Sequence, residues 1–108
     1  MALAGVCYTL FRRFPKEELY GMTGQIRRSA ASIPANIAEG QGRELTGSFV
    51  QFLRIAQGSL KELETHLLLS SQIELVPISD VTPLLESCDE LGRMLRGLIR
   101  RLEDSTRE

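Results

Sequence analysis

The 108-residue sequence contains no tryptophan, one histidine and two cysteines, and it has no long run of apolar residues. A membrane-spanning helix needs roughly eighteen or more consecutive apolar residues, so no transmembrane segment is predicted. The opening stretch MALAGVCYTLFRRF is too short and lacks the basic leader of a signal peptide, and its LAGVC resembles a lipoprotein box only loosely. We therefore expect a cytoplasmic protein that does not bind a membrane.

The residues that usually carry catalysis or bind metals are also scarce. His66 is the only histidine, and a di-iron Glu-x-x-His motif would require glutamate where the sequence has Leu63. The sequence contains no nucleophile elbow and no glycine-rich phosphate loop. Cys7 and Cys88 fall on apolar stripes, which favours buried, reduced thiols over a disulfide or a reactive site. We predict no enzyme activity, no catalytic, cofactor or metal site, and no small-molecule substrate.

The chain has no excess of either charge. Its 13 lysines and arginines face 14 aspartates and glutamates, which gives a net charge of −1. Proteins that bind nucleic acid through non-specific phosphate attraction are usually basic. Any nucleic-acid surface must therefore be a local patch, or one that several copies build together.

What the sequence does contain is helical periodicity. The hydrophobic content of 43% and the charged content of 25% are typical of one globular domain, here residues 1–108. Apolar residues recur at steps of three and four in four segments, at about 2–14, 18–39, 46–71 and 79–103. Because the connecting segments are short, we predict an all-α, up-down-up-down four-helix bundle. The first helix is short enough to leave part of the core uncovered, unless the start is truncated or a neighbouring subunit covers the gap.

A proline interrupts the second segment, in the stretch QIRRSAASIPANIAEGQGR. A proline inside a helix costs roughly 3 kcal/mol when nothing supports it. The apolar stripe nevertheless keeps its phase from Ile26 and Ile33 to Ile37, on both sides of Pro34. We predict one continuous helix that is kinked at Pro34 and closed by Gly40 as its C-terminal cap.

Two further faces of this helix suggest an assembly surface. One face is nearly bare, with Ala31 and Ala35 on it, and beside it runs a polar strip. Glu39 opposes the helix dipole, so Arg28 or Arg43 should compensate it, within or between subunits. The predicted assembly surface comprises Arg28, Ala31, Ser32, Ala35, Asn36 and Glu39. The alternatives are a ligand or RNA contact surface, or a plain solvated face whose alanines are simply good helix formers.

A group of arginines near the C-terminus is the candidate RNA-binding surface. Three of them share the face of the fourth helix opposite its leucine seam, and a fourth lies beside them. The set is Arg93, Arg96, Arg100 and Arg101. Acidic residues occupy the earlier turns, so complementation of the helix macrodipole explains the same pattern and competes with a phosphate-binding role.

Two stretches carry a resemblance to a known family. FPKEELYGMTGQIRRSAASIPANIAEGQGR and FLRIAQGSLKELETHL resemble the four-helix-bundle family of 23S rRNA intervening-sequence proteins, which includes accessory proteins of diversity-generating retroelements. The resemblance spans about residues 11–102 and implies a ring-like homopentamer. Relatives are encoded within inserts in 23S rRNA genes, or beside reverse transcriptases whose RNA and protein they engage. The positions that match the central motif are Arg27, Arg28, Ser32, Asn36, Glu39 and Gly40.

The resemblance and the residues together indicate a non-enzymatic oligomer. We expect a scaffold or accessory factor associated with RNA or with an RNA-handling enzyme, and its own copies as partners, five to a ring. The alternative is a purely structural protein–protein interaction module without a nucleic-acid role. Salt-dependent RNA binding separates the two hypotheses, because phosphate neutralisation makes the affinity fall steeply with salt.

Overall fold

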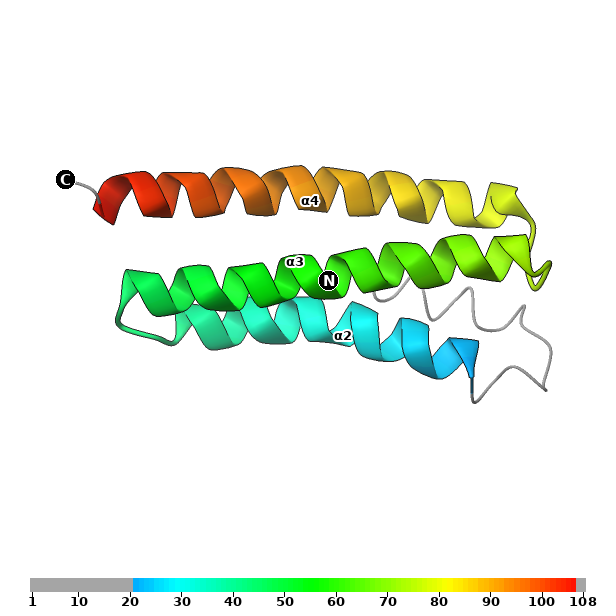
Figure 1. Cartoon of the computed structure of the whole chain (residues 1–108), viewed down its shortest axis with the longest axis horizontal. Coiled ribbons are helices and arrows are strands. Elements are labelled where there is room, and N and C mark those ends of the chain that lie inside the picture. The colour runs from blue at the N-terminus through cyan, green and yellow to red at the C-terminus, as the bar shows by residue number, and fades with distance from the viewer. Residues whose placement is uncertain (1–20, 107–108) are drawn as a thin grey trace.

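The computed structural model describes residues 21–106, which form three helices: α2 (Met22–Gln41), α3 (Thr46–Gln72) and α4 (Ile78–Thr106). Consecutive helices run antiparallel, with α3 between the other two (Figure 1). The predicted bounds of the third helix agree with α3 to within one residue at its end. α2 begins four residues later than predicted, and α4 continues three residues further. The all-α class is confirmed.

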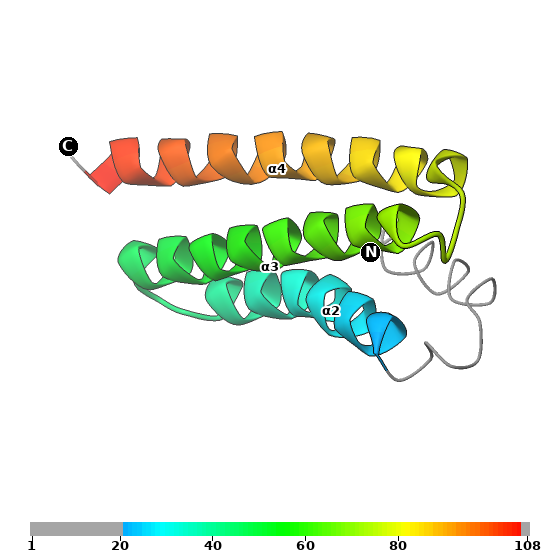
Figure 2. The same ribbon diagram turned by 45° about the vertical axis from the view of Figure 1, so that its right-hand side comes forward.

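The predicted four-helix bundle is wrong for the described chain, which has three helices. The helix expected at 2–14 lies outside the described residues. A closed bundle also requires each helix to pack on two neighbours. Here α3 packs against both α2 and α4, whereas α2 and α4 make few direct contacts (Figure 2). The described helices therefore form an open arrangement around α3.

α3 supplies the centre of the hydrophobic core. Its stripe of Leu53, Leu60, Leu63 and Leu67 is almost completely shielded from solvent. Burying a leucine side chain stabilises a fold by about 1.5–3 kcal/mol, so this stripe holds the three helices together. α3 also buries Ala56, the α3–α4 connection buries Val76, and α2 and α4 contribute the other buried apolar side chains. They are Met22, Ile26, Ala30, Ile33, Val81, Leu84, Cys88, Leu95 and Ile99.

α2 continues through Pro34 without interruption, which confirms the predicted continuity of the helix. Ile26 and Ile33 lie on the same buried face, and each is fully shielded from solvent. The packing of this face on α3 offsets the hydrogen bond that a proline cannot donate. Pro34 itself is half-buried at the side of the helix.

Gly40 was predicted to cap α2, and that prediction is wrong. Gly40 lies inside the helix and is buried, while Gly42 occupies the C-cap with an ordinary φ of −75°. A Cβ atom on Gly40 would come within 2.8 Å of both Phe49 Cδ1 and Phe52 Cβ. Glycine is therefore required here because α3 approaches the backbone of α2 closely, and not because the helix must end.

The turn between α3 and α4 contains a strained residue. Glu74 has a φ of 63°, in the left-handed region. The amide of Leu75 donates to the Ser70 carbonyl at 2.9 Å, and the amide of Glu74 donates to the Ser71 carbonyl at 3.0 Å. These two bonds form a Schellman motif, which terminates α3, with glutamate at the position where glycine is usual.

None of the described helices is both long enough and apolar enough to cross a membrane.

Candidate functional site

Two members of the predicted assembly surface are engaged within the chain, at the seam between α2 and α3. Ser32 Oγ lies 2.7 Å from Ser59 Oγ of α3. The Asn36 amide donates to the carbonyl and the hydroxyl of Ser32, at 2.8 and 2.9 Å. These side chains are half-buried, except for Ser59, which is buried. Ser32 therefore links α2 to α3, and Asn36 holds the Ser32 side chain in place.

The other members of the predicted surface point away from α3. Arg28, Ala31, Ala35 and Glu39 are all exposed, as is the neighbouring Ala38. We call this set of five residues the outer face of α2. Its centre consists of methyl groups only, so the face presents little bulk to an approaching helix.

Glu39 is compensated within the chain, by one of the two arginines that the sequence suggested. Arg43 Nη2 donates to Glu39 Oε1 at 2.7 Å. The Arg28 guanidinium instead lies along its own helix, where a Cβ on Gly24 would be 3.3 Å from Arg28 Nη1. Glu39 therefore does not need a cation from a second subunit.

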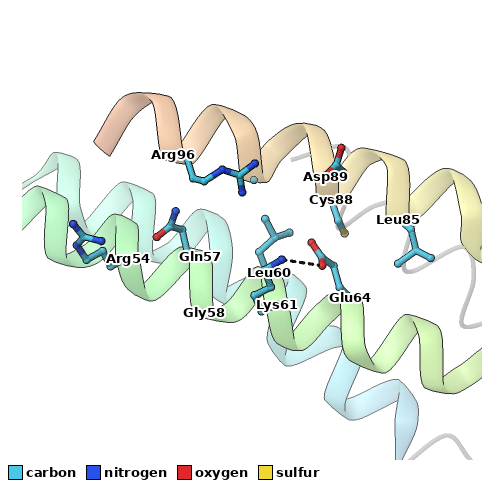
Figure 3. Close-up of a pocket in the computed structure, with 11 residues that line it drawn as sticks. Arg54, Gln57, Gly58, Leu60, Lys61, Glu64, Leu85, Cys88, Asp89 and Arg96 are labelled. Atoms are coloured by element: carbon cyan, nitrogen blue, oxygen red, sulfur yellow. Dashed lines mark hydrogen bonds and ion pairs between the residues drawn. The ribbon is translucent and has the colours of Figure 1, made fainter. Parts of the chain in front are cut away.

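The four candidate RNA-binding arginines are exposed, but they face different grooves. Arg93 Nη1 pairs with Asp89 Oδ2 of its own helix at 3.0 Å. Arg96 extends into a cavity between α3 and α4 (Figure 3). Arg100 and Arg101 border a second groove, between α4 and the end of α2. The predicted patch is therefore divided, and only Arg93 follows the simple acid–base pairing of the helix.

The second groove exposes apolar surface that no described residue covers. It has a volume of about 590 Å³, and its walls are Ile37 of α2, Leu53 of α3 and one side of α4. Met94, on that side of α4, is 64% exposed.

The cavity between α3 and α4 brings together residues that the sequence did not connect. Arg54 and Lys61 of α3 line it opposite Arg96 of α4. The periodicity of each helix shows which residues share a face, but it does not give the register between two helices. No sequence signal could therefore have paired these cations.

His66 and Cys88 belong to no metal-binding cluster of described residues. Within residues 21–106, no group of three or more His, Cys, Asp or Glu side chains could hold a metal ion. His66 is half-buried on α3, and its Nδ1 has no hydrogen-bond partner among the described residues. Cys88 is buried, as predicted, whereas Cys7 lies outside the described residues.

The model of a known protein family, described as 23S rRNA-intervening sequence protein, matches residues 1–97. The chain belongs to this family. The match includes α2, α3 and most of α4, so the outer face of α2 and the cavity between α3 and α4 are both part of the region shared with the 23S rRNA-intervening sequence proteins.

A solved structure supports the same fold. The crystal structure of a protein of unknown function from the S23 ribosomal protein family of Bacteroides thetaiotaomicron superimposes with a TM-score of 0.80. The two proteins share 24% sequence identity, and the alignment covers 91% of this chain and 92% of the other. At this identity the likeness shows the fold alone. A search of curated proteins found no match to the chain.

Proposed function

We propose that this protein is a cytoplasmic, non-enzymatic homo-oligomer, five copies to a ring, that serves as a scaffold or accessory factor for RNA or for an RNA-handling enzyme. Membership of the 23S rRNA-intervening sequence protein family supports the link to RNA. The observation that carries the proposal is the outer face of α2, whose residues are exposed and not covered by the other described helices.

The composition of the outer face favours contact with another copy. Ala31, Ala35 and Ala38 are exposed side by side, and Arg28 and Glu39 border them. Short side chains allow a neighbouring element to approach closely, so that many weak dispersion contacts form together. The opposite charges at the border then select the orientation of the neighbour. A contact between two different patches closes into a ring when the rotation between copies allows it.

The charges on α4 support a role in binding RNA that depends on assembly. Arg100 and Arg101 are exposed, and neither forms an ion pair with another described residue. One subunit carries 13 basic and 14 acidic side chains, so it has little general attraction for phosphate. A ring repeats the arginines around one rim, and several weak sites on one RNA gain affinity through effective concentration.

A titration of labelled structured RNA at several salt concentrations tests the proposal. We expect binding by the oligomer that falls steeply between roughly 50 and 200 mM salt, because bound phosphates release their counterions. The double variant Arg96→Glu with Arg100→Glu should bind much more weakly. Arg93→Glu is a useful comparison, because Arg93 is already paired with Asp89 and should contribute less.

Two results would overturn the RNA role: equal binding by the wild type and the double variant, or no binding by either at low salt. A protein–protein scaffold without a nucleic-acid role would then remain. The Asp89–Arg93 pair favours that second candidate, since it shows that part of the arginine group is neutralised within α4.

A further inference from the structure

The cavity between α3 and α4 has the size and the polarity of a small-molecule site. Its volume is about 520 Å³, and it lies on the opposite side of α4 from the groove at Met94. Sites for small ligands commonly have volumes of roughly 300–1,000 Å³, with mostly apolar walls and a few polar groups. The lining consists of Arg54, Gln57, Gly58, Leu60, Lys61, Glu64, Leu85, Cys88, Asp89, Gly92 and Arg96.

The floor of the cavity is apolar. Leu60 and Cys88 are almost completely buried there, and Leu85 is half-buried at one end. Gly92 forms part of the wall without a side chain, and a Cβ at this position would lie 3.4 Å from Arg96 Nη1 and 3.5 Å from Leu60 Cδ2. The cavity is therefore a slot in which an aliphatic group would contact carbon and sulfur atoms.

Arg96 is the one cation of the cavity that lacks a counter-ion among the described residues. Arg54 Nη2 is 2.8 Å from Glu103 Oε2, and Lys61 Nζ is 3.5 Å from Glu64 Oε2. Asp89 is already paired with Arg93. The Arg96 side chain reaches over the slot from α4 (Figure 3), so its guanidinium can receive an anion that enters the cavity.

We propose that this cavity binds a small organic anion with an aliphatic tail. Its carboxylate or phosphate group pairs with Arg96 through charge-assisted, bidentate hydrogen bonds, and its tail lies on Leu60, Leu85 and Cys88. The cavity contains no aromatic side chain on which a base could stack, which favours an aliphatic ligand over single-stranded RNA. This site does not depend on the proposed RNA role.

Calorimetric titration of the full-length protein with octanoate tests the proposal. Glycine-selective ¹⁵N labelling locates the site, because Gly58 and Gly92 line the cavity and Gly97 lines only the other groove. We expect the Gly58 and Gly92 amide signals to shift and the Gly97 signal to stay in place. Octanol tests the need for the charge and inorganic phosphate tests the need for the tail, and both should bind at least about tenfold more weakly.

Two variants test the residues. Arg96→Gln should weaken octanoate binding by about tenfold or more, because hydrogen bonds to a charged group are stronger than neutral ones. Gly92→Leu should abolish binding by filling the slot. Their controls are Arg100→Gln and Gly97→Leu, which lie at the other groove and should bind octanoate like the wild type.

Four outcomes would overturn the proposal. They are the absence of octanoate binding, equal affinity in wild type and Arg96→Gln, shifts confined to Gly97, and octanol or phosphate binding as tightly as octanoate. Salt-dependent RNA binding is measured separately. Failure of this site therefore leaves the proposed function standing, and the converse also holds.

Discussion

The guanidinium carbon of Arg43 lies 5.0 Å from the centroid of the Phe52 ring, so a residue just beyond α2 covers an aromatic side chain of α3. Arg43 also pairs with Glu39 in the last turn of α2. The arginine thus supplies positive charge where the helix dipole requires it, and it offsets the unfavourable position of Glu39. At the same time it fixes the α2–α3 connection against Phe52.

We predict that Arg43→Gln lowers the free energy of unfolding by about 1 kcal/mol. An exposed cation–π contact contributes about 0.5–1 kcal/mol, and an exposed i,i+4 ion pair contributes about 0.3–0.5 kcal/mol. Urea denaturation at a fixed protein concentration measures the difference. Arg101→Gln is the matched control, since Arg101 is exposed without an ion pair to another described residue. Equal losses in the two variants would refute a special role for Arg43.

Gly40→Ala should destabilise the protein by about 1–3 kcal/mol, because overpacking forces neighbouring atoms to move. One of the two clashing atoms is Phe52 Cβ, which cannot retreat without a shift of α3. Gly97→Ala is the opposite case: a Cβ at Gly97 meets nothing within 4 Å. It should stabilise α4 by up to about 1 kcal/mol, the helix-propensity difference between the two residues. Thermal unfolding followed by circular dichroism gives both values, and a Gly40→Ala variant as stable as the wild type would contradict the close approach of α3.

Glu74→Gly should raise the free energy of unfolding by about 0.5–1 kcal/mol. A side chain in the left-handed region costs roughly 1–2 kcal/mol, part of which glycine loses again through the greater freedom of the unfolded chain. Asparagine tolerates this conformation better than glutamate, so Glu74→Asn should fall between the two. The measurement is the midpoint of urea denaturation, which reports the difference in stability when the dependence of the unfolding free energy on urea is the same for all variants. A destabilised Glu74→Gly variant would show that the glutamate side chain contributes an interaction that outweighs the backbone strain.

Features that depend on spacing along one helix could be predicted from the sequence. The apolar periodicity at 46–71 is confirmed by the buried stripe of α3, and the unbroken phase across Pro34 is confirmed because Ile37 packs against the same core as Ile33. The pairing of Glu39 with Arg43 is also a local relationship, four residues apart. In each case the partners lie on the same or an adjacent segment, so the helix geometry alone brings them together.

Features that depend on how two helices meet could not be predicted. A glycine that follows a helical pattern in a sequence usually indicates a C-terminal cap. Gly40 instead lacks a side chain so that Phe49 and Phe52 of α3 can approach the backbone of α2. The left-handed turn at Glu74 could not be predicted, because the sequence has glutamate where a glycine would usually mark this conformation. The arginines of α4 share a helix, but the neighbouring helices decide which groove each one borders. The predicted number of helices is wrong for the described chain, which has three, and the segment at 2–14 lies outside the described residues.

The outer face of α2 leads to the last prediction, which concerns assembly. Ala35 is exposed in the single chain, so a larger side chain there meets no described neighbour and should leave the fold intact. If this face packs against another copy, Ala35→Leu introduces overpacking at the interface alone, at a cost of about 1–3 kcal/mol. That cost corresponds to a weakening of the subunit affinity by roughly 5- to 150-fold.

Light scattering coupled to size exclusion should give about five times the 12.1 kDa chain mass for the wild type and a smaller mass for Ala35→Leu at low micromolar concentration. Glu86→Leu, an exposed position on α4, should keep the mass of the wild type, and the circular dichroism spectra of both variants should match that of the wild type. A wild type that elutes as a 12.1 kDa monomer would refute the assembly proposal, because the uncovered alanines would then belong to an ordinary solvated helix face.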